Sequence, residues 1–181
     1  MDSVPLSDFQ RTIIDACASE KMLTLVDNER WNGTTTALAV YVAQGKGGQF
    51  SYVGPTVRDG EIFVAMLSWL ARGQGEHTNM AVKCSDFECK AYTYADLGAK
   101  RSGTSSLLAG LDGTLVLENF NKCALLFADA RVFAIPPGVR AIVSSDDLGA
   151  PLASNKAIAT LTPDSVVSVK WAPNEEQQDA K

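Results

Sequence analysis

Histidine is almost absent from this chain of 181 residues, which contains only His77. A Ser-His-Asp or Cys-His nucleophilic site would have to use that one imidazole, which follows the polar stretch Gly73–Glu76. The G-x-S-x-G sequence that places a nucleophilic serine on a sharp turn is also missing. The sequence therefore disfavours triad chemistry, and we expect His77 to be an exposed loop residue.

The chain also lacks a strong excess of charge of one sign. It has 16 Lys+Arg against 21 Asp+Glu, which gives a net charge of −5. Lys100 and Arg101 are the only two adjacent basic residues, so no segment resembles the basic surface that binds a nucleic-acid duplex. The composition therefore disfavours nucleic acid as a partner.

Long apolar segments are missing as well. No segment approaches the roughly 20 apolar residues that span a bilayer. The first residues lack the basic start and apolar stretch of a signal peptide. We therefore expect a cytoplasmic protein without membrane contact, in which Cys17, Cys84, Cys89 and Cys123 are reduced thiols.

What the chain does have is enough apolar content to form a core. Apolar residues make up 46% of a 19.3 kDa chain, and a length of about 100–200 residues favours one domain. We expect a single globular domain over residues 1–172. The polar residues 173–181 are expected to form a disordered acidic tail.

The first half of the chain contains two expected helices and three expected strands. Ser7 and Gln10 fit a capping box for a helix over residues 7–20. Met22–Val26 is typical of a strand, and the β-branched segment Thr34–Val42 with Phe50–Val53 indicates a hairpin around a glycine-rich turn. A second helix over residues 61–70 is expected to have Asp59 as its N-cap.

The second half is expected to be rich in hairpins. The predicted elements are two short strands within residues 80–94 around Asp86, one or two helical turns over 106–111, a strand over 114–117, a short helix through Phe127 capped by Asn119 or Asn121, and hairpins formed by residues 131–135 with 139–144 and by 157–161 with 166–171. Short turns between strands favour antiparallel pairing. We therefore predict an α+β fold with a mainly antiparallel sheet, an N-terminal capped helix and two or three further short helices.

The sharpest motif is the segment Gly98–Ser105. Its spacing matches G-x-x-x-x-G-x-[ST], the pattern of a loop whose backbone N–H groups surround phosphates. The position of the phosphate-binding lysine holds Thr104, so Lys100 would have to act from inside the loop. This segment is a candidate degenerate nucleotide-binding loop.

Two later segments resemble parts of AAA+ ATPases. Thr114–Glu118 is similar to the apolar strand that ends in a metal-associated acid, and Val139–Ser145 is similar to the sensor strand that ends in polar residues. The resemblance implies a nucleotide site in which Glu118 is the metal-associated acid. Residues 106–115 leave too little chain for the helix and strand that normally separate such a loop from the acid-bearing strand.

Other chemistry-bearing residues do not form a recognised set. His77, Cys84, Cys89 and the distant Cys123 lack the second close pair that is typical of structural zinc. The carboxylate pairs at 146–147 and 175–176 are typical of solvated turns and tails. We therefore assign no catalytic residue, no metal and no cofactor.

Three functional hypotheses follow. The leading one is a non-catalytic interaction or assembly protein within a larger complex such as a viral particle, with a protein partner or self-association through exposed strand edges. The second is an enzyme whose site is assembled from scattered carboxylates, serines or cysteines. The third is a nucleotide binder that uses Gly98–Ser105.

Overall fold

The computed structural model describes residues 4–19, 21–27, 33–45, 48–99, 107–120, 122, 135–136, 138–146 and 163–170. Several expected features lie outside these residues: the strand over 157–161, the tail over 173–181, residue Cys123 with most of the helix expected to follow Asn119 or Asn121, and residues 131–134 of an expected hairpin.

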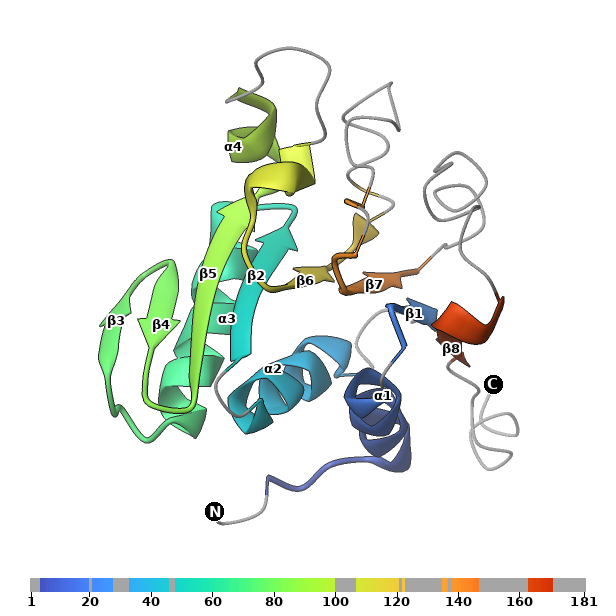
Figure 1. Ribbon diagram of the computed structural model, residues 1–181. Coiled ribbons are helices and arrows are strands. Elements are labelled where there is room, and N and C mark those ends of the chain that lie inside the picture. The colour runs from blue at the N-terminus through green and yellow to red at the C-terminus, as the bar shows by residue number, and fades with distance from the viewer. Residues whose placement is uncertain are drawn as a thin grey trace, which may run out of the picture.

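A mixed eight-stranded sheet forms the centre of the molecule (Figure 1). Its order is β3-β4-β5-β2-β6-β7-β1-β8. The strands are β1 (Leu23–Asp27), β2 (Gly48–Gly54), β3 (Glu76–Thr78), β4 (Ala81–Lys83), β5 (Phe87–Thr93), β6 (Thr114–Leu117), β7 (Ala141–Ser145) and β8 (Val166–Lys170).

Parallel pairing dominates this sheet, so the prediction of a mainly antiparallel α+β fold is wrong. Among the described strands, the pairs β5–β2, β2–β6, β6–β7, β7–β1 and β1–β8 are parallel, while the pairs β3–β4 and β4–β5 are antiparallel. Neighbouring parallel strands require long crossover connections. The connection from β2 to its neighbour β5 contains the helix Val57–Leu70. The architecture is a Rossmann-like α/β fold.

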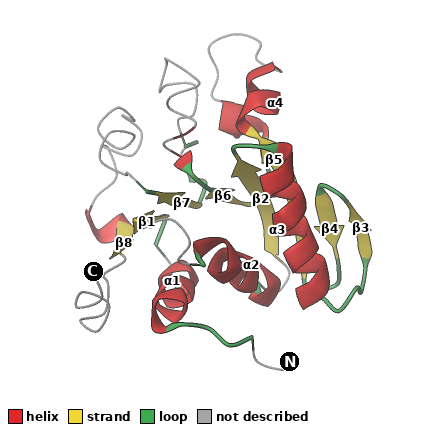
Figure 2. Cartoon of the chain, turned by 180° about the vertical axis from the view of Figure 1, so that it is seen from behind, coloured by secondary structure: helices red, strands yellow, loops and turns green. Residues whose placement is uncertain are grey.

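Three helices cover one face of the sheet (Figure 2): α1 (Asp8–Ala18), α2 (Thr34–Gln44) and α3 (Val57–Leu70). They share a core with strand residues that point to that face, including Val26, Tyr52, Val116 and Ile142. The opposite face packs against α4 (Tyr94–Ala99) and the short 3-10 helix η1 (Leu107–Gly110), with Leu115, Leu117 and Val143 from the strands.

Helix α2 explains much of the difference from the predicted topology. The β-branched segment Thr34–Val42 was expected to be half of a hairpin, yet it forms a helix that joins β1 to β2. Because α2 lies between α1 and α3, nearly all of its side chains are buried. A helix buried on all sides shows no amphipathic period, so local pattern favours a strand.

Residues that cap the ends of helices predict the observed helices more accurately. Ser7 and Gln10 form the expected capping box of α1. The helix expected over residues 61–70 is present as the longer α3, but its N-cap is Thr56 and Asp59 is its third residue. Among the described residues, no helix has both the length and the apolar character needed to cross a membrane.

Candidate nucleotide site at the carboxyl edge of the sheet

The carboxyl ends of four parallel strands lie next to one another in the middle of the sheet. Asp27 of β1 pairs with Ser145 of β7, and Leu117 of β6 pairs with both Val53 of β2 and Val143 of β7. After β2 the chain continues to β3, β4 and β5 on one side of it, whereas the next strand after β6 is β7 on the other side. In open α/β sheets, ligands bind outside the carboxyl ends of the strands at such a reversal.

Glu118 follows β6 at this edge and lies only 5% exposed. The Thr35 hydroxyl in the first turn of α2 donates a hydrogen bond to its Oε1 atom. The Tyr52 hydroxyl of β2 donates to its Oε2 atom over 2.6 Å. One buried carboxylate therefore connects the start of α2 with two neighbouring strands.

The environment of Glu118 has opposing effects on its charge. Burial raises the pKa of the Glu118 carboxyl, while the hydrogen bonds from Thr35 and Tyr52 act to lower it. Burial, and then the neighbouring Glu118 carboxylate, also raise the pKa of Tyr52, so this phenol stays protonated and can donate. The ring of Tyr52 stacks on Phe63 with 4.1 Å between centroids, which fixes the direction of its hydroxyl.

The N-terminus of α2 differs from those of α1 and α3. Each of the latter has a complete capping box, whereas Gly33 precedes α2 and gives no side-chain cap. Gly33 has a φ of 77°, a left-handed conformation that glycine adopts at little cost. Its carbonyl accepts a 3.0 Å hydrogen bond from Gln10, so α1 fixes the entrance to α2. The backbone N–H groups in the first turn of a helix attract anions.

Ser144 of β7 adds an unpaired polar group at the same edge. Its side chain is fully buried, and its Oγ atom has no hydrogen-bond partner among the described residues. Ile142 and Val116 point to the helical face, and side chains two residues further along a strand share that face. Ser144 and Glu118 therefore point to the face that carries α2.

Together these residues form a strand, a connection and a helix start in the order of a phosphate-binding loop. That motif is strand, G-x-x-x-x-G-K-[ST], helix. In the sequence after β1, Asn28 stands at the first glycine, Gly33 at the second, Thr34 at the lysine and Thr35 at the hydroxyl position. Residues 28–32 lie outside the described part of the structure. The second glycine and the hydroxyl position match the pattern, whereas the first glycine and the lysine are missing.

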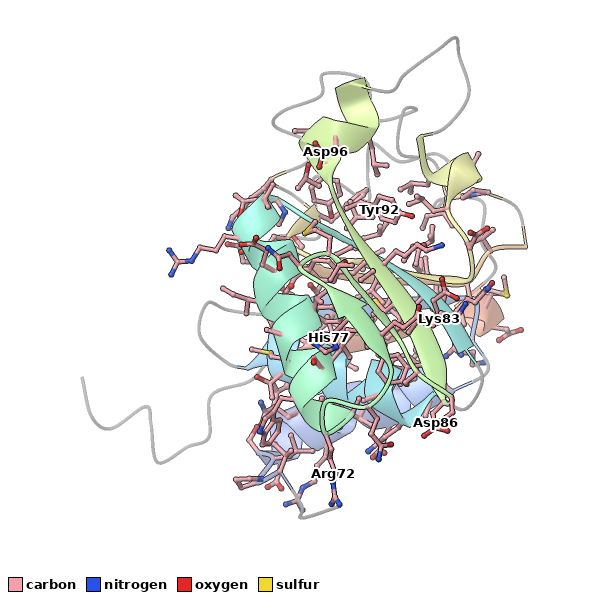
Figure 3. All side chains as sticks on the ribbon, turned by 90° about the vertical axis from the view of Figure 1, so that its left-hand side faces the viewer. Arg72, His77, Lys83, Asp86, Tyr92 and Asp96 are labelled. Carbon is pink, nitrogen blue, oxygen red and sulfur yellow. The ribbon has the colours of Figure 1, made fainter. Side chains whose placement is uncertain are left out.

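The structure does not place the sequence-predicted candidates together. Gly98 and Ala99 lie in α4, and Lys100–Ser105 fall outside the described residues. His77 is exposed on β3 at the far edge of the sheet (Figure 3), on a strand rather than in the expected loop. Cys84 follows β4, while the buried Cys89 lies on β5.

Sequence reasoning missed Thr35, Tyr52 and Ser144 but had identified Glu118 as a strand-end acid. A usable signal was present: Gly33-Thr34-Thr35 comes shortly after the strand expected over residues 22–26. The β-branched residues that follow favour a strand over a helix and so hide this signal. Tyr52 and Ser144 join the site only through the sheet order, which no local pattern reveals.

Solved structures share the α/β fold that positions this site. The chain is similar to the large terminase ATPase domain of Thermus phage P74-26, with a TM-score of 0.61 and 13% identity, over 92% of this chain and 80% of that one. An arginine-to-alanine mutant of that domain gives a TM-score of 0.57 and 13% identity, over 93% and 82%. No protein-family model matches the chain, and no curated protein matches its sequence.

The likeness corrects two expectations. The leading hypothesis of a non-catalytic assembly protein is wrong, because the neighbours are ATPase domains and favour the nucleotide-binding alternative. The expectation that nucleic acid is disfavoured as a partner is contradicted as well, because the shared fold is that of a large terminase domain. Net charge alone was too weak a criterion for excluding such a partner.

Proposed function

We propose that this chain is a degenerate nucleotide-binding domain that holds the phosphates of a nucleoside triphosphate at the N-terminus of α2. The observation that carries the proposal is the contact between Thr35 and Glu118, at the carboxyl edge of a terminase-like sheet. It joins the helix start that would receive the phosphates to the strand end that carries the acid. The unpaired hydroxyl of Ser144 supplies a further donor on the same face.

The same residues predict poor hydrolysis. Thr34 stands where the lysine that reaches the β- and γ-phosphates is expected. Asn119, which follows Glu118, has an amide side chain and cannot accept a proton from an attacking water as a carboxylate does. We therefore expect nucleotide binding with very slow turnover.

A substitution at Thr36 tests where the phosphates bind. Thr36 is the third residue of α2, where an acidic side chain stabilises a helix by about 0.3–1 kcal/mol. Thr36→Asp should therefore preserve folding but repel phosphate, and Thr36→Asn is the matched neutral control. By isothermal titration calorimetry with ATP, we expect Thr36→Asp to bind at least about ten-fold more weakly than Thr36→Asn, a difference of roughly 1.4 kcal/mol.

A substitution in the segment over residues 98–105 provides the comparison. Thr104→Ala should leave ATP affinity unchanged if the phosphates lie at α2. Equal affinities of Thr36→Asp and Thr36→Asn, or no ATP binding by the unaltered chain at millimolar nucleotide, would contradict the proposal.

A further inference from the structure

Both carboxylate oxygens of Glu118, the acidic residue at the proposed phosphate site, already accept hydrogen bonds. Magnesium in phosphate-binding loops is held by the loop hydroxyl together with an acid at a strand end. Here the corresponding pair is Thr35 and Glu118, and the Thr35 hydroxyl donates a hydrogen bond to the Glu118 carboxylate. The second carboxylate oxygen accepts the 2.6 Å hydrogen bond from Tyr52.

The side chains of Glu118 and Tyr52 have little space in which to change conformation. Glu118 and Tyr52 are almost fully buried, and the stacked ring of Phe63 prevents the phenol from turning away without loss of packing. The peptide N–H of Glu118 donates to the Val53 carbonyl over 3.0 Å, and its carbonyl accepts from the Tyr94 hydroxyl over 3.0 Å. The backbone of Glu118 is therefore held as firmly as its side chain.

The described acid whose charge acts on Glu118 already has hydrogen-bond partners of its own. Asp59 is the acid whose charge acts on Glu118, but its Oδ2 atom accepts from both the backbone N–H and the hydroxyl of Thr56 at the start of α3. The residue after Glu118 is Asn119, which is neutral. Within the described part of the chain, no three histidine, cysteine or acidic side chains form a cluster that could hold a metal ion.

These donors do not fit Mg²⁺, which requires near-octahedral oxygen geometry and usually one or two accessible carboxylates. We propose that the site binds nucleotide without a divalent cation, and that the hydroxyls of Thr35 and Tyr52 take the place of the metal as partners of Glu118. Glu118 is then a positioning residue, which holds the first turn of α2 against β2 and β6. This inference rests on the proposed function and defines the form of the ligand as the metal-free nucleoside triphosphate.

The test compares ATP binding in EDTA with ATP binding in MgCl2 by isothermal titration calorimetry on the full chain. We expect the affinity in EDTA to equal or exceed the affinity in MgCl2. An affinity at least about ten-fold higher in MgCl2 overturns this inference while leaving the proposed function intact. No binding in either buffer overturns the proposed function itself, so the two failures are distinguishable.

Tyr52→Phe tests the part played by the hydroxyl. This variant keeps the stack on Phe63 and frees one oxygen of Glu118, so we expect MgCl2 to strengthen its ATP binding several-fold relative to EDTA. Tyr41→Phe is the matched control, because Tyr41 is a buried tyrosine of α2 whose ring packs near Phe50 instead. The same metal response in Tyr52→Phe and in the unaltered chain overturns the role given to Tyr52.

Discussion

At the scale of single residues, the proposed site is defined by side-chain identities at a few positions of a common scaffold. A threonine replaces the expected lysine, an asparagine follows the acid, and a buried tyrosine occupies one of the acid's two oxygens. Each change lowers the capacity of the site for charge compensation or proton transfer. The fold can therefore be retained while the chemistry is lost, because the scaffold does not depend on the lysine.

Two buried thiols make the folded state less stable at alkaline pH. Burial raises the pKa of Cys17 and of Cys89 from 9.0 to about 12. Above the unfolded value of 9.0 the unfolded chain releases these protons while the folded chain keeps them, so stability is fully present below that pH and falls as pH rises. The slope approaches about 1.4 kcal/mol per pH unit for each thiol. Urea unfolding between about pH 8 and pH 10 should show the fall, and Cys17→Ala should reduce the slope. An unchanged slope in that variant would contradict the assignment of Cys17.

At the scale of elements, the parts with local end signals could be predicted from the sequence. The capping box at Ser7 and Gln10 defines α1 without reference to the rest of the fold. The strands β1 and β6 were also found, because short apolar β-branched segments between polar residues are typical of strands. Helix α2 was misassigned because its burial on all sides removes the period by which helices are recognised.

Arg140 shows how one side chain joins separate elements. Its guanidinium donates to the carbonyls of Cys17 and Ser19 at the end of α1, and it lies 6.0 Å from the centroid of the Tyr41 ring. A positive charge at a helix C-terminus is stabilising, and carbonyls left without a donor are costly.

We therefore expect Arg140→Met to lower the free energy of unfolding by about 2–3 kcal/mol in urea denaturation. Arg140→Lys keeps the charge but not the forked geometry, so it should recover only part of that loss. Full stability in Arg140→Met would show that the guanidinium contacts contribute nothing to the folded state.

At the scale of the whole molecule, strand order is the property that local pattern could not supply. Short turns suggested hairpins, yet β6, β7, β1 and β8 are parallel strands whose partners lie far away in the sequence. The sheet order brings the end of β6 next to β2 and β7, and it thereby unites Glu118 with Tyr52 and Ser144. The acid at the strand end could be recognised from the sequence, whereas its partners required the fold.

The central claim is that nucleotide binds at the start of α2 and the end of β6. Hydrogen–deuterium exchange of the full chain with and without ATP tests this directly, because exchange reports which backbone amides a ligand protects. The account predicts slower exchange in peptides that cover residues 33–40 and 114–120, with EDTA present. Unchanged exchange there, or protection confined to residues 98–106, would contradict it.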